Sequence, residues 1–258
     1  KFKKFSEDST KMIDHAVCMT KEHPSFGEVI NIITDQADIL LNTTIHKPNK
    51  FAISGLQRRD WIFSGPVAKK LELLHISVYK DGRIEVIEPN GKIHSQEYVS
   101  NRNFLSLHIS DLITEGSSAY RKQGITESGW LPSLRNIGVE TRNLDVVVSR
   151  LQGGEELLIK EGINTRSYVK IDKDFLNRHS NNPEIAISYQ SNPTEWSENY
   201  LKENGALSLL AHFDPNKKQE DRCVKFLQRY VNQLKEYKKL DELSEAVKNS
   251  YGYSLEKY

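Results

Sequence analysis

Between residues 51 and 176, short apolar segments alternate with segments whose apolar residues recur at helical spacing. No other feature of the sequence constrains the fold as strongly. The predicted strands cover residues 51–55, 75–79, 84–87, 105–110, 144–149 and 168–171. Strands that alternate with helices predict an α/β domain, in which a mostly parallel sheet is flanked by helices. Ligands of such sheets bind at the carboxyl ends of the strands.

The composition excludes several classes of function. A chain of 258 residues suits one large domain, or one domain with extensions. Its 36 Lys and Arg nearly balance its 35 Asp and Glu, which argues against bulk attraction to nucleic acid or to an anionic membrane. No apolar run approaches the ~18 residues of a membrane span, and no signal peptide is visible. Cys18 and Cys223 lack metal-type spacing, so we expect free thiols and a cytoplasmic protein.

The most informative loop follows the predicted strand 105–110. Asp111 comes next, then the loop Thr114–Ser118, and helix-forming residues are expected from Ala119 onward. Backbone amides and hydroxyls in such a loop can bind an anion, and a helix N-terminus would add partial positive charge. Asp111 could then hold sugar hydroxyls or a divalent cation beside a phosphate. The alternative is an ordinary strand–turn–helix connection with a Ser N-cap.

Two arginines follow the strand 51–55. Arg58 and Arg59 suit a polyanion such as pyrophosphate, because each guanidinium can bond two oxygens. A helix is predicted over residues 66–74, with Pro66 in its first turn. The alternative interpretation is a solvated arginine pair with Asp60 as its salt-bridge partner.

Two further loops are expected at the same rim of the sheet. Lys80 begins a Lys-Asp-Gly turn after the strand 75–79, which predicts a hairpin with the strand 84–87. Arg150 follows the β-branched strand 144–149, and a Gly-Gly pair and a helix come after it. Arg150 could pair a carboxylate of a ligand bidentately, or form a surface ion pair with a nearby glutamate.

Both ends of the chain are predicted to be helical. Residues 1–41 carry two apolar sets at helical spacing, one on each side of Pro24. Beyond residue 181, a helix is expected over 196–203 and a longer one over 221–247, the latter for packing or dimerisation with a solvated face.

Residues 107–118, LHISDLITEGSS, resemble the ribose-5-phosphate-binding loop of the type I phosphoribosyltransferases. Residues 146–176, from VVVSRLQGG onward, resemble the orotate phosphoribosyltransferases, and the likeness spans roughly 26–176 in the correct order. Three positions depart from the pattern. Ser110 and Ser149 stand where acids are usual, and Glu115 stands where a second Thr is common. The family's mobile cationic loop is also not found after Lys80.

The resemblance implies transfer of ribose 5-phosphate from phosphoribosyl pyrophosphate to a nitrogenous base, orotate or a related pyrimidine, with Mg²⁺ and release of pyrophosphate. It implies a homodimer with no nucleic-acid or membrane partner. It also implies a hood at 1–45 and a core at 46–180. The helical extension at 181–258 lies beyond the resemblance and is expected from its helical spacing. The implied catalytic residues are Asp111, which also binds the metal, Lys80 and Glu115. The implied substrate-binding residues are Arg58, Arg59, Thr114, Gly116, Ser117, Ser118 and Arg150.

Two other classes of function stay open. The protein could be a regulator that binds a nucleotide or phosphoribosyl pyrophosphate without chemistry, which the departures at Ser110 and Ser149 favour. It could also be a protein–protein scaffold that uses its C-terminal helices.

Overall fold

The computed structural model describes residues 8–43, 50–210, 213–215, 227 and 230–255, without the side chains of 204–209. The chain divides into two compact units, Lys1–Ser180 and Asn181–Tyr258. Each unit is considered by itself below.

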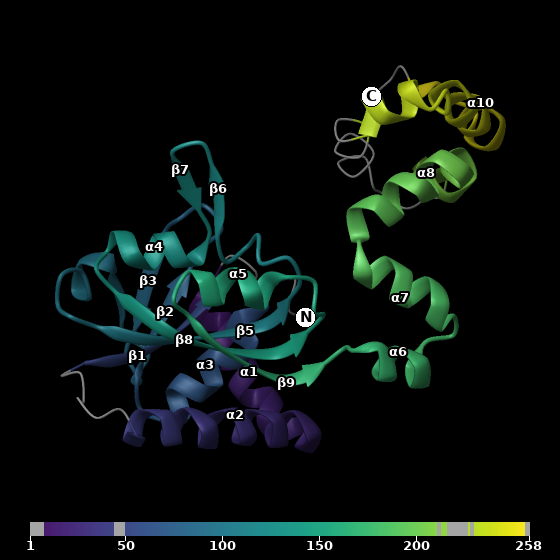
Figure 1. The fold of residues 1–258 in the computed structure, drawn as a ribbon. Coiled ribbons are helices and arrows are strands. Elements are labelled where there is room, and N and C mark those ends of the chain that lie inside the picture. Colours follow the sequence, from purple (N-terminus) through teal and green to yellow (C-terminus); the bar gives the residue numbers. More distant parts are fainter. Residues whose placement is uncertain (1–7, 44–49, 211–212, 216–226, 228–229, 256–258) are drawn as a thin grey trace. The chain divides into compact units, whose positions relative to one another are not determined.

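The first unit is built on a seven-stranded sheet with the order β4-β3-β2-β1-β5-β8-β9 (Figure 1). Its strands are β1 (Phe51–Leu56), β2 (Leu74–Val78), β3 (Ile84–Ile87), β4 (Ile93–Ser95), β5 (Leu105–Ile113), β8 (Glu140–Ser149) and β9 (Asn164–Lys170). β2, β1, β5, β8 and β9 run parallel, whereas β3 and β4 are antiparallel. The predicted α/β architecture with a mostly parallel sheet is therefore confirmed.

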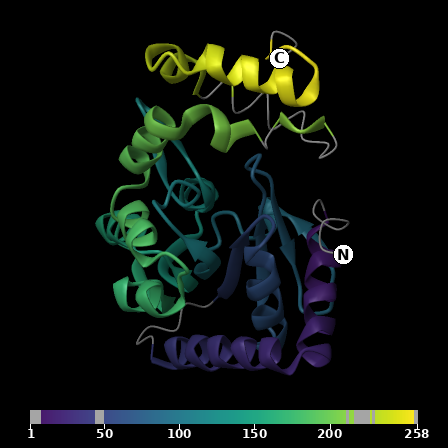
Figure 2. The same ribbon diagram turned by 90° about the vertical axis from the view of Figure 1, so that its right-hand side faces the viewer.

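Helices cover both faces of this sheet (Figure 1). On one side lie α1 (Ser9–Glu22), α2 (Pro24–Thr43) and α3 (Asp60–Lys70), and on the other α4 (Trp130–Asn136) and α5 (Gly154–Lys160). Figure 2 shows α1 and α2 running in different directions. The short helices η2 (Gln96–Tyr98) and α6 (Lys173–His179) complete the unit.

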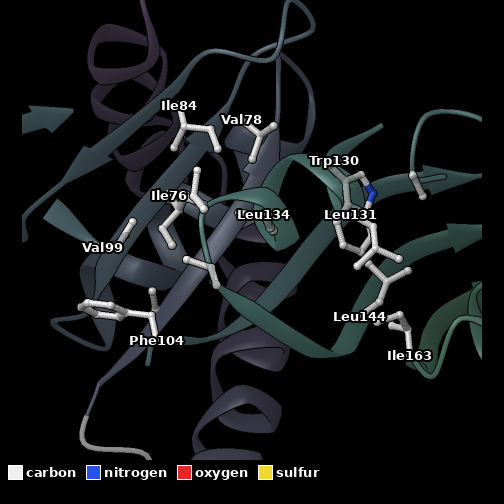
Figure 3. Close-up of a cluster of buried hydrophobic side chains, with 14 of the residues drawn as sticks. Ile76, Val78, Ile84, Val99, Phe104, Trp130, Leu131, Leu134, Leu144 and Ile163 are labelled. Atoms are coloured by element: carbon white, nitrogen blue, oxygen red, sulfur yellow. The ribbon is translucent and has the colours of Figure 1, made fainter. Parts of the chain in front are cut away.

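Each face has its own apolar core, because successive strand residues point to opposite faces. The cluster beneath α4 and α5 includes Ile76, Val78, Leu131, Leu134 and Leu144 (Figure 3). The cluster beneath α2 and α3 includes Ile30, Ile33, Ile53, Val67, Leu107 and Ile109. Both faces of the central strands are buried, and β8 accordingly carries a run of valines, whereas β5 alternates apolar residues with Ser and His. These two patterns are why the strands could be predicted.

The helix predicted over residues 66–74 begins six residues earlier, at Asp60, and Pro66 lies inside it. An acidic residue in the first turn stabilises a helix N-terminus, and Asp60 occupies that position. The indole Nε1 of Trp61 donates to the carbonyl of Gly55 at 2.9 Å and so fixes the start of the helix against β1. The sequence prediction gave Pro66 too much weight as a helix start.

The helix expected from Ala119 onward is also wrong. The amides of Ala119 and Tyr120 both donate to the carbonyl of Gly116, which closes a turn. A hairpin follows, made of β6 (Arg121–Gln123) and β7 (Thr126–Ser128), and α4 begins only after it. Gly124 at the hairpin turn has φ +62°, a left-handed conformation that glycine adopts without steric cost.

The second unit contains α7 (Pro183–Ser191), α8 (Pro193–Leu210) and α10 (Leu240–Tyr251). This unit has an apolar cluster of its own, which joins Leu201 of α8 and Leu243 and Val247 of α10 to Phe213 and Leu234. The single helix predicted over 221–247 is interrupted at Lys238, where φ is +55°. Residues 221–226 and 228–229 of that prediction, with Cys223, lie outside the described residues, as do residues 1–7 of the N-terminal prediction. None of the described helices combines the length and the apolar character needed to cross a membrane.

Candidate functional site

The parallel strands bring four loops to one edge of the sheet. Leu56 at the end of β1 pairs with Val78 of β2, and Ile113 at the end of β5 pairs with Ser149 of β8. The loops that follow these strands contain almost every residue expected at the site. This edge is therefore the candidate site.

The carboxylate of Asp60 joins two of these strands. Its Oδ2 accepts from the amide of Leu56 at 3.2 Å, and its Oδ1 accepts from the amide of Asp111 at 2.9 Å and from the hydroxyl of Ser110 at 3.2 Å. Only 6% of Asp60 is exposed. Asp60 therefore connects β1 to β5, and the alternative interpretation of the arginine pair is wrong in its partner, since among the described residues Arg59 pairs with Asp111 and not with Asp60.

Asp111 is the acid that meets an arginine. Its Oδ2 lies 2.9 Å from Nε of Arg59, and the side chain of Asp111 is 16% exposed against 70% for Arg59. Burial, followed by the nearby Asp60 carboxylate, raises the pKa of Asp111 to about 7, although Arg59 acts in the opposite direction. Asp111 therefore takes up or releases a proton near neutral pH, and a cation or hydrogen-bond donor from a ligand would favour its charged form.

A buried histidine, His108, lies beside Asp60. The imidazole of His108 stacks on Trp130 with 3.8 Å between ring centroids, and its Nδ1 lies 3.0 Å from the hydroxyl of Ser54. Its Nε2 lies 3.5 Å from Oδ2 of Asp60. Burial lowers the pKa of His108, and Asp60 partly opposes this shift. Burial works against ionisation of Asp60 too, but His108 and the Asp111 amide outweigh it and lower the pKa of Asp60.

Asp60 and His108 were not predicted as part of the site. An acid in the first turn of α3 was the one available signal for Asp60, and it was hidden by the late helix start at Pro66. His108 alternates with apolar residues in β5, so it reads as an ordinary strand residue.

The loop Thr114–Ser118 is held by close backbone packing against α5. The amide of Gly154 donates to the carbonyl of Thr114 at 2.9 Å. A Cβ on Gly154 would lie 2.5 Å from that carbonyl oxygen and 2.8 Å from the amide nitrogen of Gly116. Only glycine fits such an approach.

Three amides of this loop are not used in hydrogen bonds among the described residues. Within the part of the chain that the structure describes, the amides of Glu115, Ser117 and Ser118 donate to no other group. All three side chains are exposed. Exposed amides next to serine hydroxyls can bind an anion, but the helix N-terminus predicted at Ala119 does not contribute to this loop.

A cavity of about 570 Å³ opens beside this loop. Its lining residues include Leu56, Tyr79, Lys80, Asp81, Gly82, Ser117, Ser118, Arg121, Glu127, Ser128, Gly129 and Ser133. Three predicted residues, Lys80, Ser117 and Ser118, therefore share one cavity. Arg121 is a cation that the sequence analysis did not place there.

The other predicted residues lie along the same edge outside this lining. Arg58 is exposed and follows a cis peptide bond from Gln57, whose Oε1 accepts from the amide of Lys80 at 3.2 Å. The amide of Arg150 donates to the carbonyl of Ile113 at 3.0 Å, which places Arg150 beside the end of β5.

Asp111 is also the residue that could take part in holding a metal ion. Among the described residues, no group of three or more His, Cys, Asp or Glu side chains is arranged to enclose a metal. Mg²⁺ commonly binds through one or two carboxylates together with phosphates of the substrate, and a single carboxylate at the edge fits that mode. Both oxygens of Asp60 already accept hydrogen bonds from the chain, which leaves Asp111 as the fitting carboxylate.

Comparisons with known proteins identify no family for this chain. No family profile matches the sequence, and no curated protein matches it. Among solved structures, an adenine phosphoribosyltransferase from Thermoanaerobacter pseudethanolicus is 15% identical with a TM-score of 0.40, over 59% of this chain and 84% of that one. An orotate phosphoribosyltransferase from Aeropyrum pernix is 18% identical with a TM-score of 0.38, over 60% and 75%. The UMP synthase of Leishmania donovani is 15% identical with a TM-score of 0.41, over 71% and 42%. At this identity and with TM-scores below 0.5, these likenesses assign neither a family nor a substrate nor an activity to this chain.

Proposed function

We propose that this protein binds phosphoribosyl pyrophosphate at the carboxyl edge of its sheet and transfers the ribose 5-phosphate to a nitrogenous base. The observation that carries the proposal is the position of Asp111 directly before a loop whose amides have no partner among the described residues. Asp111 can accept hydrogen bonds from a diol, and the loop Thr114–Ser118 can bind a phosphate. The two lie a few residues apart at the carboxyl edge of the sheet. Orotate or a related pyrimidine is the acceptor base to test first.

Each group has a defined task in this reaction. The Asp111 carboxylate accepts hydrogen bonds from the two ribose hydroxyls, and the amides and hydroxyls of Ser117 and Ser118 bind the 5-phosphate. The bond from the ribose C1 to pyrophosphate breaks, and the pyrophosphate leaves with the electron pair. A nitrogen of the base then bonds to C1. Lys80, Arg58 and Arg59 stabilise the charge of the leaving group.

Three tasks remain at the edges of this site. Mg²⁺ beside Asp111, when bound, would neutralise further charge on the pyrophosphate. Arg150 would orient a base that carries a carboxylate, because a guanidinium can pair both of its oxygens. Thr114 and Gly116 shape the phosphate loop, and Glu115 serves as the second acid near the ribose in place of Ser110.

A non-catalytic binder is the second candidate, and one observation favours it. After β2 the chain makes a tight turn, in which the amide of Gly82 donates to the carbonyl of Tyr79 at 3.0 Å and the amide of Tyr79 to the carbonyl of Arg83 at 2.8 Å. Such a turn cannot close over a transition state as a mobile loop does. Ser110 and Ser149, which stand where the family usually has acids, also favour a binder without catalysis.

A direct assay separates these candidates. Labelled phosphoribosyl pyrophosphate with Mg²⁺ is incubated with orotate, uracil or a purine, and nucleotide and pyrophosphate are measured. The enzyme should release both products in equal amounts, and Asp111→Asn should abolish the reaction, while Asp14→Asn on the exposed face of α1 should not. Binding without product from any base would support the regulator, and neither binding nor product would reject both.

A further inference from the structure

The β6–β7 hairpin is the feature of the first unit that the proposed reaction does not yet use. It replaces the helix expected after the phosphate loop, and Figure 1 shows it projecting beyond α4. All of its strand residues are exposed, and Ile125 at the turn is fully exposed at 100%. Packing against a core therefore does not account for the hairpin.

The base of the hairpin belongs to the cavity beside the phosphate loop. Arg121, Glu127 and Ser128 line the same space of about 570 Å³ as Ser117 and Ser118. Arg121 and the two serines of the phosphate loop thus line one volume that can hold a phosphorylated sugar.

The acids that line this cavity already have donors. Glu127 accepts from the hydroxyl of Tyr120 at 2.8 Å, and its Oε1 lies 3.9 Å from Nζ of Lys122. Asp81 accepts from the amide of Arg83 at 3.0 Å. Across the described ranges, the side chain of Arg121 forms neither an ion pair nor a hydrogen bond. Its guanidinium is therefore available to a ligand.

We propose that Arg121 binds the phosphate that the Thr114–Ser118 loop holds, so that the β6–β7 hairpin is a cationic wall of the sugar-phosphate site. The inference rests on the proposed function. A guanidinium can bond two phosphate oxygens at once, whereas a lysine offers a point charge. The hairpin also supplies positive charge on the side where the tight turn after Lys80 leaves no mobile cationic loop.

Ribose 5-phosphate binding to the full chain tests this proposal by calorimetry. Arg121→Gln should weaken binding about tenfold or more, because a charge-assisted bidentate contact is lost. The affinity of Arg121→Lys for ribose 5-phosphate should lie between those of the wild type and Arg121→Gln. Lys122→Gln is the matched control, since Lys122 neighbours Arg121 on the same strand but pairs with Glu127. This control should stay within about twofold of the wild type, as expected for an exposed pair.

The outcomes distinguish a failure of the proposed role of Arg121 from a failure of the proposed function. If the wild type does not bind ribose 5-phosphate, both the proposed function and this inference fail. If the wild type binds and Arg121→Gln binds equally well, or if Arg121→Gln and Lys122→Gln weaken binding equally, the role of Arg121 is overturned while the function stands. Pyrophosphate is measured alongside, and its affinity should change less than that of ribose 5-phosphate.

Discussion

The two halves of the candidate site differ in how firmly the chain holds them. On the β1–β5 side, Asp60 is almost fully buried and accepts three hydrogen bonds that connect Leu56, Ser110 and Asp111. On the hairpin side, residues 121–128 are all exposed, and only a few contacts hold their side chains. The first half should therefore influence folding and binding together, and the second should influence binding alone.

This difference suggests a division of tasks. A buried network presents the sugar-binding acid in one fixed geometry, which lowers the cost of ordering it on binding. An exposed hairpin can adjust to the phosphate without disturbing the core. Variants on the two sides should therefore separate stability from affinity.

The largest expected effect is that of Asp60→Ala. The amides of Leu56 and Asp111 and the hydroxyl of Ser110 would lose a buried acceptor. Buried donors left without partners cost about 1–3 kcal/mol each, so for three donors we expect a total loss of at least about 3 kcal/mol in the free energy of unfolding. Urea denaturation measures it. Asp14→Ala, which removes an exposed ion pair with Lys69, should change stability by less than about 1 kcal/mol.

The next effect is a displacement of the phosphate loop by Gly154→Ala. The new Cβ would approach the backbone at Thr114 and Gly116, so the loop must move, at a cost of about 1–3 kcal/mol. Affinity for ribose 5-phosphate should fall as well. Gly162→Ala is the control, because its φ of +81° strains an alanine backbone, but a Cβ there meets nothing within 4 Å and leaves the phosphate loop in place. A fall in affinity for both variants would show that a general loss of stability, and not displacement of the loop, is responsible.

These features also show what sequence alone could predict. The strands around Ile53, Leu107 and Val146 were predictable from their apolar residues, which follow one another at Val146 and alternate with Ser and His around Leu107. The loops at the carboxyl edge followed from the strand order along the chain. Their hydrogen bonds did not, because Asp60 and Asp111 are brought together only by the pairing of β1 with β5.

The hairpin shows a different limit. Residues 119–123 have no strong preference against a helix, and the turn that excludes one depends on the carbonyl of Gly116. That carbonyl is placed by the packing of Gly116 against Gly154, some 38 positions away in the sequence. The contact between Gly116 and Gly154 therefore overrides the local preference for a helix. Without the resulting turn and hairpin, Arg121 would not line the cavity.

A moderate effect is expected from pH. The pKa of Asp111, about 7, lies above its ordinary 3.8 because burial and Asp60 favour the protonated form. The folded state thus binds the proton more tightly than the unfolded state. The stability from this proton is fully present below pH 3.8 and is lost as the pH rises through about 7. The midpoint temperature of thermal unfolding of the wild type should fall relative to that of Asp111→Asn between about pH 5 and pH 8. Parallel curves of midpoint temperature against pH for the two proteins would contradict the raised pKa.

The smallest effect is expected at the tip of the hairpin. Ile125 is fully exposed, so Ile125→Thr removes no buried surface and should change the free energy of unfolding by less than about 0.5 kcal/mol. Ribose 5-phosphate affinity should also be unchanged, because Ile125 does not line the cavity. Together with a large effect of Arg121→Gln, this result would confine the contribution of the hairpin to its base. If Ile125→Thr weakened binding as much as Arg121→Gln does, the whole hairpin would have to close over the ligand, and the cation at its base would not be the decisive group.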